Sequence, residues 1–367
     1  MPGKLACPCR IYSYGALGAV TIVGITLMVS AYNDIDSDSQ RDALAVPTPV
    51  LVAQADEDGF HQVNRAGSVD LRATYDLDNL LIPEDEIHTL LPRDAIPSLT
   101  DPRLEPIVTN TWLQPGDRVI DVTIDDESVA VPLKILNYHE IANMTVAGEP
   151  VAATYCPLCD SASVISRRVE HEGESHVLEF GVSGALYNSN VLMYDRTLMG
   201  LWSQLGLRCV SGPMSGVELR HLPMRVVTWM HYKLTHPSGM VLSYDTGHAN
   251  QYEFEPYADY FERDGTIVPV RGIGAALATK KTLGLGVKQG NTTWFITIDA
   301  IGDEFILDTP AGPLRVSTND AGIYVDEVPE DTTTVQTFYY SWSAFHPDTR
   351  VISSDEERTP EGDETDS

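Results

Sequence analysis

Lysine is nearly absent from this 367-residue chain, and basic residues of both kinds are few. Lys provides six of the 24 basic residues against 53 Asp and Glu, which gives a formal net charge of −29. This excess repels the phosphate backbone of DNA or RNA and excludes the attraction on which non-specific nucleic-acid binding depends. Many carboxylates with few lysines predict a halophilic source, and the alternative is an ordinary acidic secreted protein.

Several enzyme signatures are also missing. The chain has no phosphate-binding loop with Gly-Lys-Ser/Thr, and the glycine-rich stretch 272–286 lacks the strand, helix and acidic residue of a dinucleotide site. The stretch 181–184, Gly-Val-Ser-Gly, resembles the nucleophile elbow of hydrolases only superficially, because its glycine spacing is wrong. Ser183 is therefore assigned to a turn.

One long apolar run stands near the start of the chain. The 22 residues from Ile11 to Tyr32 carry no charge, and as a helix of about 33 Å they would cross a bilayer. Lys4 and Arg10 precede the run and acidic residues follow it, so residues 1–10 are expected in the cytoplasm and the rest outside. The prediction is a transmembrane anchor, and the alternative is a signal peptide cleaved after Ala31, which would give a secreted protein.

The chain beyond this run divides into three parts by composition. Residues 33–66 are acidic, contain Pro47 and Pro49 and show no sustained period, which predicts a flexible linker. Residues 353–367 are charged and almost free of apolar residues, which predicts a disordered acidic tail. The folded domain is expected over residues 67–352.

The pattern of this central part favours strands. Apolar residues alternate over short runs bounded by Gly, Pro, Asn and Asp, as in 117–136, 176–184 and 292–307. The best helix candidates are 83–91, with acidic residues in its first turn, and 134–143. The predicted fold class is mainly β with short helices, a β-rich α+β domain.

A faint internal repeat is also present. The stretches Thr228–Ser243 and Phe338–Ser353 both contain aromatic residues, a His-Pro step and a closing apolar pair before Ser. This predicts two related β units in one compact fold, with the cysteine-containing segment only in the first, and chance similarity is the alternative. His236 and His346 of the two His-Pro steps are interpreted as capped corners and not as ligands.

The five cysteines are unevenly placed. Cys7 and Cys9 precede the apolar run, whereas Cys156, Cys159 and Cys209 follow it, an odd number in an oxidising compartment. Cys156 and Cys159 are separated by Pro and Leu, and such a pair can close a disulfide on a turn or bind a soft metal ion.

Further ligand types lie near this pair in sequence. His139 precedes Cys156, and Met193 follows the pair, so two thiolates, an imidazole and a thioether form a set that suits copper. We predict a soft-metal site, copper favoured, at His139, Cys156, Cys159 and Met193. The alternatives are a thiol–disulfide redox protein, with Cys156 attacking and Cys159 resolving, and a non-enzymatic surface module with a structural disulfide, so whether the protein is an enzyme stays open.

The order of motifs resembles the exported bacterial and haloarchaeal proteins grouped as domain of unknown function 3179. The resemblance extends from about Pro102 to Ile352. It is carried by His-Glu-Ile at 139–141, TYCPLC at 154–159, FGVSGALYNS at 180–189, MYDR at 193–196, LWSQ at 201–204, Trp229 with His236-Pro237, and Pro256-Tyr257.

The resemblance implies one site assembled from separate segments, in a family with no known activity. It adds four site candidates to the metal set, Glu140, Asp195, Trp202 and Gln204. The chain departs from the family at Asp160, where a Gly usually follows the second cysteine. An acidic neighbour there would raise the pKa of the Cys159 thiol.

Overall fold

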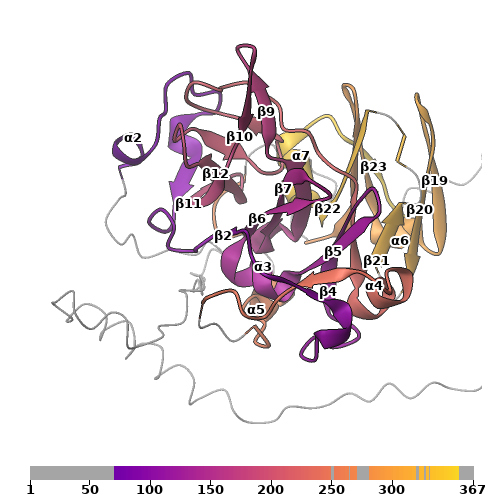
Figure 1. The fold of residues 1–367 in the computed structure, drawn as a ribbon. Helices are drawn as coiled ribbons and strands as arrows, with labels where there is room; N and C mark the ends of the chain where they lie inside the picture. The colour runs from indigo at the N-terminus through magenta and orange to yellow at the C-terminus, as the bar shows by residue number, and fades with distance from the viewer. Residues whose placement is uncertain are drawn as a thin grey trace, which may run out of the picture. The chain divides into compact units, whose positions relative to one another are not determined.

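The computed structural model describes residues 70–248, 252–263, 265–270, 281–319, 322–325, 328–329 and 331–354. Strands predominate in these residues and the helices are short (Figure 1), which confirms the predicted fold class. No helix among them is long and apolar enough to cross a membrane. The apolar run 11–32, the linker 33–66 and the tail from 355 onward lie outside the described residues.

The first β unit is built on a five-stranded sheet with the order β15-β4-β5-β16-β3. These strands are β15 (Met224–Thr228), β4 (Arg118–Ile124), β5 (Glu127–Pro132), β16 (Met240–Leu242) and β3 (Leu104–Pro106). Strands β4 and β5 form a hairpin whose turn includes Asp125 at φ 49°, a left-handed conformation that Asp tolerates.

The second unit repeats this arrangement with the order β22-β17-β18-β23. Its strands are β22 (Thr332–Phe338), β17 (Leu283–Gln289), β18 (Thr292–Thr297) and β23 (Arg350–Ile352). In each unit the first hairpin strand pairs with a strand that leads directly into a helix, α4 (Trp229–Thr235) or α7 (Tyr339–Phe345). The strand after that helix then pairs in parallel with the second hairpin strand. The shared topology confirms two related β units.

Both helices end at the predicted His-Pro corners. His236 ends α4 at φ −125° and ψ 68°, and His346 ends α7 at φ −134° and ψ 70°. The backbone N–H of His236 donates to the Tyr232 carbonyl over 2.8 Å, and that of His346 donates to the Trp342 carbonyl over 2.9 Å. The corner is therefore a common element of the two units.

Two further sheets lie in sequence between the hairpin and helix α4 of the first unit, and they carry the cysteines. One has the order β2-β6-β7-β8, with β2 (Leu99–Thr100), β6 (Ile141–Val146), β7 (Glu149–Cys156) and β8 (Ser161–Ser166). The other has the order β1-β11-β12-β13-β14, with β1 (Ile87–Thr89), β11 (Phe180–Tyr187), β12 (Asn190–Asp195), β13 (Leu201–Ser203) and β14 (Arg208–Cys209). Strands β1 and β2 come from the segment before the first unit.

The remaining elements are small. The strands are the hairpin β9 (Arg168–His171) and β10 (Glu174–Val177) and the sheet β19 (Glu304–Thr309), β20 (Gly312–Asn319) and β21 (Gly322–Val325). The α-helices are α2 (Leu71–Thr74), α3 (Leu133–His139), α5 (Ala258–Glu262) and α6 (Ile298–Ile301). The 3₁₀ turns are η2 (Glu84–Glu86), η3 (Ile107–Thr109) and η4 (Pro157–Cys159).

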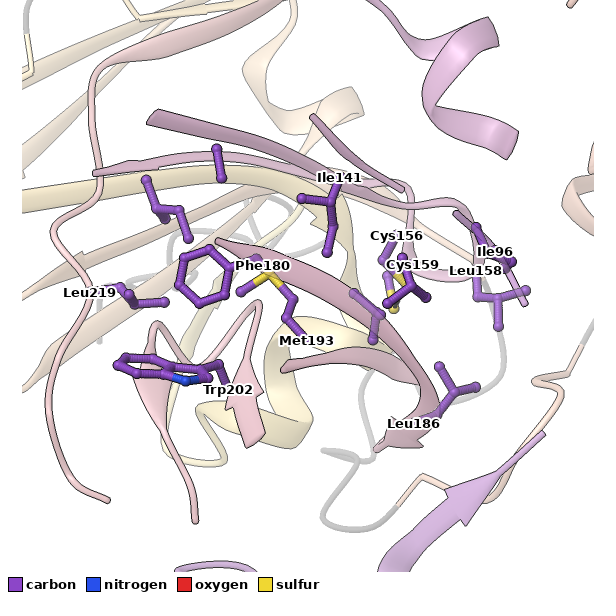
Figure 2. Packing of buried hydrophobic residues seen from close by; sticks show 14 of the residues in the cluster. Ile96, Ile141, Cys156, Leu158, Cys159, Phe180, Leu186, Met193, Trp202 and Leu219 are labelled. Atoms are coloured by element: carbon purple, nitrogen blue, oxygen red, sulfur yellow. Dashed lines mark hydrogen bonds between the residues drawn. The ribbon is translucent and has the colours of Figure 1, made fainter. Parts of the chain in front are cut away.

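A hydrophobic cluster joins the two cysteine-bearing sheets (Figure 2). Phe180, Met193 and Trp202 are fully buried in it beside Cys156 and Cys159. The rings of Phe180 and Trp202 meet edge to face with centroids 5.6 Å apart. Burial of each large apolar side chain contributes roughly 1.5–3 kcal/mol to the stability of the fold. The close packing of the cluster surrounds the two sulfurs with a rigid environment.

Three sequence predictions need correction. The helix expected over 83–91 is only the turn η2 followed by β1, because Ile87–Thr89 pair with β11 and Ile87 is buried. The helix expected over 134–143 ends at His139, since Glu140 adopts φ 55° and β6 begins at the next residue. Ser183 is not in a turn but in β11, at a bulge between Val182 and Ala185.

Candidate functional site

The two cysteines lie where a strand gives way to a tight turn. Strand β7 ends at Cys156, Pro157 opens the 3₁₀ turn η4, and Asp160 at φ 46° leads the chain into β8. Proline suits the first position of such a turn because its missing N–H needs no partner. The two sulfurs are 3.5 Å apart, unbonded and almost fully buried.

Hydrogen-bonding groups converge on the Cys159 sulfur. Its thiol donates to the Ser189 carbonyl over 3.0 Å, and the same oxygen lies 3.8 Å from the Cys156 sulfur. The Asn190 amide donates to the Cys159 sulfur over 3.6 Å. Ser341 Oγ is buried and has no hydrogen-bond partner in the part of the chain that the structure describes.

These contacts make the two thiols unequal. Burial raises the pKa of Cys159, but hydrogen bonds from polar neighbours, Cys156 and Asn190 among them, outweigh burial and lower the pKa below its usual value. Burial raises the pKa of Cys156 well above its usual value, and the hydrogen bond with Cys159 raises it further. Cys159 is therefore the sulfur that ionises first, the reverse of the order in which Cys156 is the attacking thiol.

Asp160 does not act on Cys159 as the sequence suggested. Its carboxylate accepts hydrogen bonds from Arg118 Nη1 over 2.9 Å and from the Tyr155 hydroxyl over 2.8 Å. The Arg118 charge balances the buried carboxylate, and the left-handed backbone directs the side chain into this ion pair. The pKa of Cys159 is lowered, and Asp160 is not among the groups that shift it most.

Gln204 supports the site from behind Asn190. Its Oε1 accepts from Asn190 Nδ2 over 2.8 Å and from Ser161 Oγ over 3.1 Å, while its Nε2 donates to Thr154 Oγ1 over 3.3 Å. All four side chains are buried. Because every link in this network is satisfied, the Asn190 amide is fixed toward Cys159.

Glu140 brings a buried carboxyl group toward the other sulfur. Its Oε2 has no hydrogen-bond partner among the described residues, and burial followed by the charge of Cys156 raises its pKa well above the usual value. Glu140, Cys156, Leu158 and Tyr257 are among the residues around a cavity of about 20 Å³. Most of its lining is aliphatic, the Glu140 carboxyl and the Cys156 thiol are among its few polar groups, and its volume is that of one water molecule.

The predicted ligands His139 and Met193 are engaged elsewhere. His139 Nδ1 lies 2.7 Å from the Pro97 carbonyl and Nε2 lies 2.7 Å from the Tyr252 hydroxyl, and burial lowers the pKa of the ring to about 4. Met193 of β12 packs with Phe180 in the hydrophobic cluster (Figure 2). Within the described residues, no group of three or more His, Cys, Asp or Glu could hold a metal ion.

Asp195 and Trp202 form a separate structural contact. Trp202 Nε1 donates to Asp195 Oδ2 over 3.0 Å, and the backbone N–H of Gly200 donates to the same oxygen over 3.2 Å. The carboxylate thus closes the turn between β12 and β13. Cys209 is buried next to this turn, where burial raises the pKa of its thiol to about 12.

The second β unit supplies contacts that sequence reasoning missed. Thr337 Oγ1 donates to the Cys159 carbonyl over 3.0 Å, and the Tyr340 hydroxyl donates to the Leu158 carbonyl. Both residues lie at the junction of β22 and α7, and the two contacts span 178 and 182 residues of the chain. The aromatic run that begins α7 is the signal in the sequence that points to this region.

The comparisons with known proteins give a family and no activity. The family model described as "Protein of unknown function (DUF3179)" matches residues 93–304. No curated protein matches the chain, and no solved structure does. The matched residues include the two cysteines, Glu140 and Gln204, and end before α7.

Proposed function

We propose that this chain, which belongs to the DUF3179 family of proteins of unknown function, is a thiol–disulfide redox protein that acts through Cys156 and Cys159. The observation that carries the proposal is the pair of sulfurs 3.5 Å apart, of which one has a lowered and the other a raised thiol pKa. A disulfide bond is about 2.05 Å long, so closing it requires the sulfurs to approach by about 1.5 Å.

The inequality of the two thiols favours a defined order of steps. Because the Cys159 sulfur is buried, the turn η4 first opens locally and exposes it. The Cys159 thiolate then attacks one sulfur of an oxidised disulfide partner, forming a mixed disulfide and releasing the other sulfur as a thiolate. Cys156 then loses its proton and attacks Cys159, which releases the second partner thiolate and leaves the internal disulfide. Reduction of the protein runs through the same steps in reverse.

Glu140 supports this chemistry as a proton carrier. Its carboxyl group is held protonated by burial, and it shares a water-sized cavity with Cys156. When the internal disulfide is reduced, Cys156 leaves as a thiolate and takes a proton, which the Glu140 carboxyl supplies through a water molecule. When Cys156 is oxidised, its proton returns by the same route.

The proposal includes export from the cytoplasm. Residues 11–32 act as a membrane anchor, or as a signal peptide if cleaved after Ala31, and they deliver the domain to an oxidising compartment. Disulfides form and persist in such compartments, so a cysteine pair that cycles there has oxidised partners available. The partner is a molecule that carries a disulfide bond or a pair of thiols.

A redox titration of the full chain tests the proposal. The protein is equilibrated in mixtures of reduced and oxidised dithiothreitol, and a maleimide then blocks the remaining free thiols. The mass of the peptide that contains Cys156 and Cys159 is measured. We expect both thiols to disappear together in a reversible two-electron step. Cys156→Ser should abolish the step, whereas Cys209→Ser should leave it unchanged.

Two results would contradict the proposal and identify its competitors. A pair that stays reduced at every potential while the protein remains folded indicates a structural role. Copper bound near stoichiometrically to the purified protein, and lost in Cys156→Ser, indicates the soft-metal site instead. Elemental analysis of the same samples distinguishes these results.

A further inference from the structure

A second polar cluster lies on the sheet of the first β unit. Ser128 Oγ on β5 lies 3.0 Å from His236 Nδ1, and His236 Nε2 lies 3.1 Å from Asp121 Oδ2 on β4. A hydroxyl, an imidazole and a carboxylate in series are the groups that activate a serine nucleophile, here with the roles of the two ring nitrogens exchanged relative to the serine-protease triad. The histidine comes from the end of α4, so three separate elements supply the three groups.

The carboxylate of this cluster is fixed in place. Asp121 is 2% exposed, and it accepts hydrogen bonds from Arg225 Nη2 over 2.9 Å and from Thr123 Oγ1 over 3.0 Å. An ionised carboxylate can only accept hydrogen bonds, so the neutral His236 ring must carry its proton on Nε2. The lone pair of Nδ1 is then directed to the Ser128 hydroxyl, as a general base requires.

The cluster is open to solutes, unlike the cysteine pair. Ser128 is half-buried, and the side chain of His236 is 17% exposed. Thr123 is exposed, and its hydroxyl lies 2.9 Å from Ser128 Oγ. A small molecule can therefore reach the serine without a change in the fold.

The second β unit provides an internal comparison. Arg118 on β4 and Leu283 on β17 are equivalent, because each pairs with the residue that directly precedes its helix. Counting residues from Arg118 along β4 and from Leu283 along β17, and following the strand pairing, gives the equivalent positions in the two sheets. The second unit has Gly286 for Asp121, Val335 for Arg225 and Thr293 for Ser128.

The corner histidine is therefore common to both units, whereas its charged partners are not. His346 packs on Trp342 with ring centroids 4.1 Å apart, at a position where its sheet offers Gly and Val in place of the carboxylate and the guanidinium. The corner forms without Asp121 and Arg225, so helix termination does not explain them. Burying a carboxylate costs free energy, which a purely structural corner would not require.

A cavity of about 440 Å³ begins next to the cluster, at Thr123. Ile124, Leu222 and Pro223 are its apolar lining residues, whereas Asp125, Glu149 and Arg220 are charged, and Arg220 is paired with Glu149. The hollow has room for a short acyl chain along its apolar residues. The hydroxyl pair of Thr123 and Ser128 connects this cavity with the His236 ring.

We propose that Ser128, His236 and Asp121 form a nucleophilic site that accepts acyl groups from carboxylic esters. Ser128 Oγ attacks the ester carbonyl and its proton passes to His236 Nδ1. The ester C–O bond breaks, and the leaving alcohol takes that proton. Water, deprotonated by His236, then cleaves the acyl–serine bond to release a carboxylic acid and regenerate the serine. This site is independent of the redox proposal.

Covalent labelling of the folded full chain tests the proposal. A fluorophosphonate probe is added, and peptide mass spectrometry locates the adduct formed when Ser128 Oγ displaces fluoride from phosphorus. We expect one adduct, on Ser128, and hydrolysis of a short-chain p-nitrophenyl ester by the same preparation. His236→Gln should slow labelling about 100-fold or more, because general-base catalysis contributes about that much.

The second unit offers matched controls. Thr293→Ala and His346→Gln occupy the equivalent positions and should leave the labelling of Ser128 unchanged, whereas Ser128→Ala should abolish it. A folded wild-type protein that forms no adduct would overturn the proposal, as would labelling that proceeds at the same rate in His236→Gln. The location of the adduct is read from the wild-type protein, so the test does not depend on the folding of any variant.

Discussion

Asn190 donates its side-chain amide to the Cys159 sulfur over 3.6 Å, and Gln204 Oε1 fixes that amide from 2.8 Å. A hydrogen bond to a charged acceptor stabilises it more than a hydrogen bond to a neutral one. The amide therefore favours the thiolate over the thiol. This contact is one reason why the pKa of Cys159 lies below its usual value despite complete burial.

Replacing Asn190 with Ala should raise the pKa of Cys159 and slow its reaction with a small alkylating reagent. A hydrogen bond to a charged group contributes about 1.5–3 kcal/mol, so the reaction rate at neutral pH should fall about tenfold or more. Stopped-flow or mass-resolved alkylation of the folded protein measures this rate. Cys209 in the same sample is the control, since Asn190 does not contact it. An equal change in the alkylation rates of both cysteines would show that the substitution loosens the fold as a whole.

Replacing Glu140 with Gln should reduce the dependence of stability on pH. The pKa of Glu140 is raised in the folded protein by burial, so the folded state holds a proton that the unfolded state releases as pH rises. The wild-type contribution is therefore complete at low pH, below the usual pKa of a glutamate, and is lost as pH rises toward the raised value. The unfolding free energy of wild type should fall more steeply than that of the variant as pH rises above the usual pKa of a glutamate.

Chemical denaturation at several pH values measures the two slopes. Glu149→Gln is not a suitable control, because Glu149 pairs with Arg220, but Glu174→Gln replaces an exposed carboxyl and serves as the control. Parallel slopes for wild type and Glu140→Gln would contradict a buried protonated carboxyl at this position.

Gly286→Ala should destabilise the second β unit. A Cβ atom at Gly286 would overlap the indole of Trp342, which lies directly over this glycine. Overpacking of a buried site costs about 1–3 kcal/mol, so the midpoint of thermal unfolding should fall by several degrees. Gly116→Ala is the matched control, since a Cβ there meets no atom within 4 Å. Equal midpoints for the two variants would exclude the contact as a source of stability.

Removing one member of the Arg118–Asp160 ion pair should cost more than removing both. Arg118→Met leaves the buried Asp160 carboxylate without its cation, and we expect a loss on the order of 2 kcal/mol because Arg118 is 37% exposed. The double variant with Asp160→Asn should recover part of that loss. Urea unfolding of the two single variants and the double variant gives the coupling free energy, and a value near zero would contradict a stabilising pair.

The fold class and the repeat could be predicted because they depend on local patterns. Alternation of apolar residues is decided by which face of a strand is buried, and it indicates β4 and β5 of the first unit and β18 of the second. The His-Pro corners were visible because the helix must end at the same place in each unit. The end of α3 was not visible, since the left-handed conformation of Glu140 depends on tertiary packing and not on residue type.

The site could be predicted only in part, because the spacing of residues along the chain does not fix the directions in which their side chains point. Cys156 and Cys159 are neighbours through the turn itself, and Gln204 does reach them through Asn190. His139 is close in sequence to Glu140, yet its two ring nitrogens bond Pro97 and Tyr252. The metal set of four ligands thus stays a sequence prediction. The pairing of Cys156 and Cys159 is supported by the distance between their sulfurs and by the opposite shifts of their thiol pKa values.

The contacts from Thr337 and Tyr340 bear on where this protein can be truncated. The family match ends at residue 304, and a fragment cut there would keep both cysteines and most of their surroundings. It would discard the Thr337 side chain that donates to the Cys159 carbonyl and the Tyr340 hydroxyl that donates to the Leu158 carbonyl. Such a fragment would retain the motif but lose side chains that hold its turn, so a fragment made to test the redox proposal has to include α7.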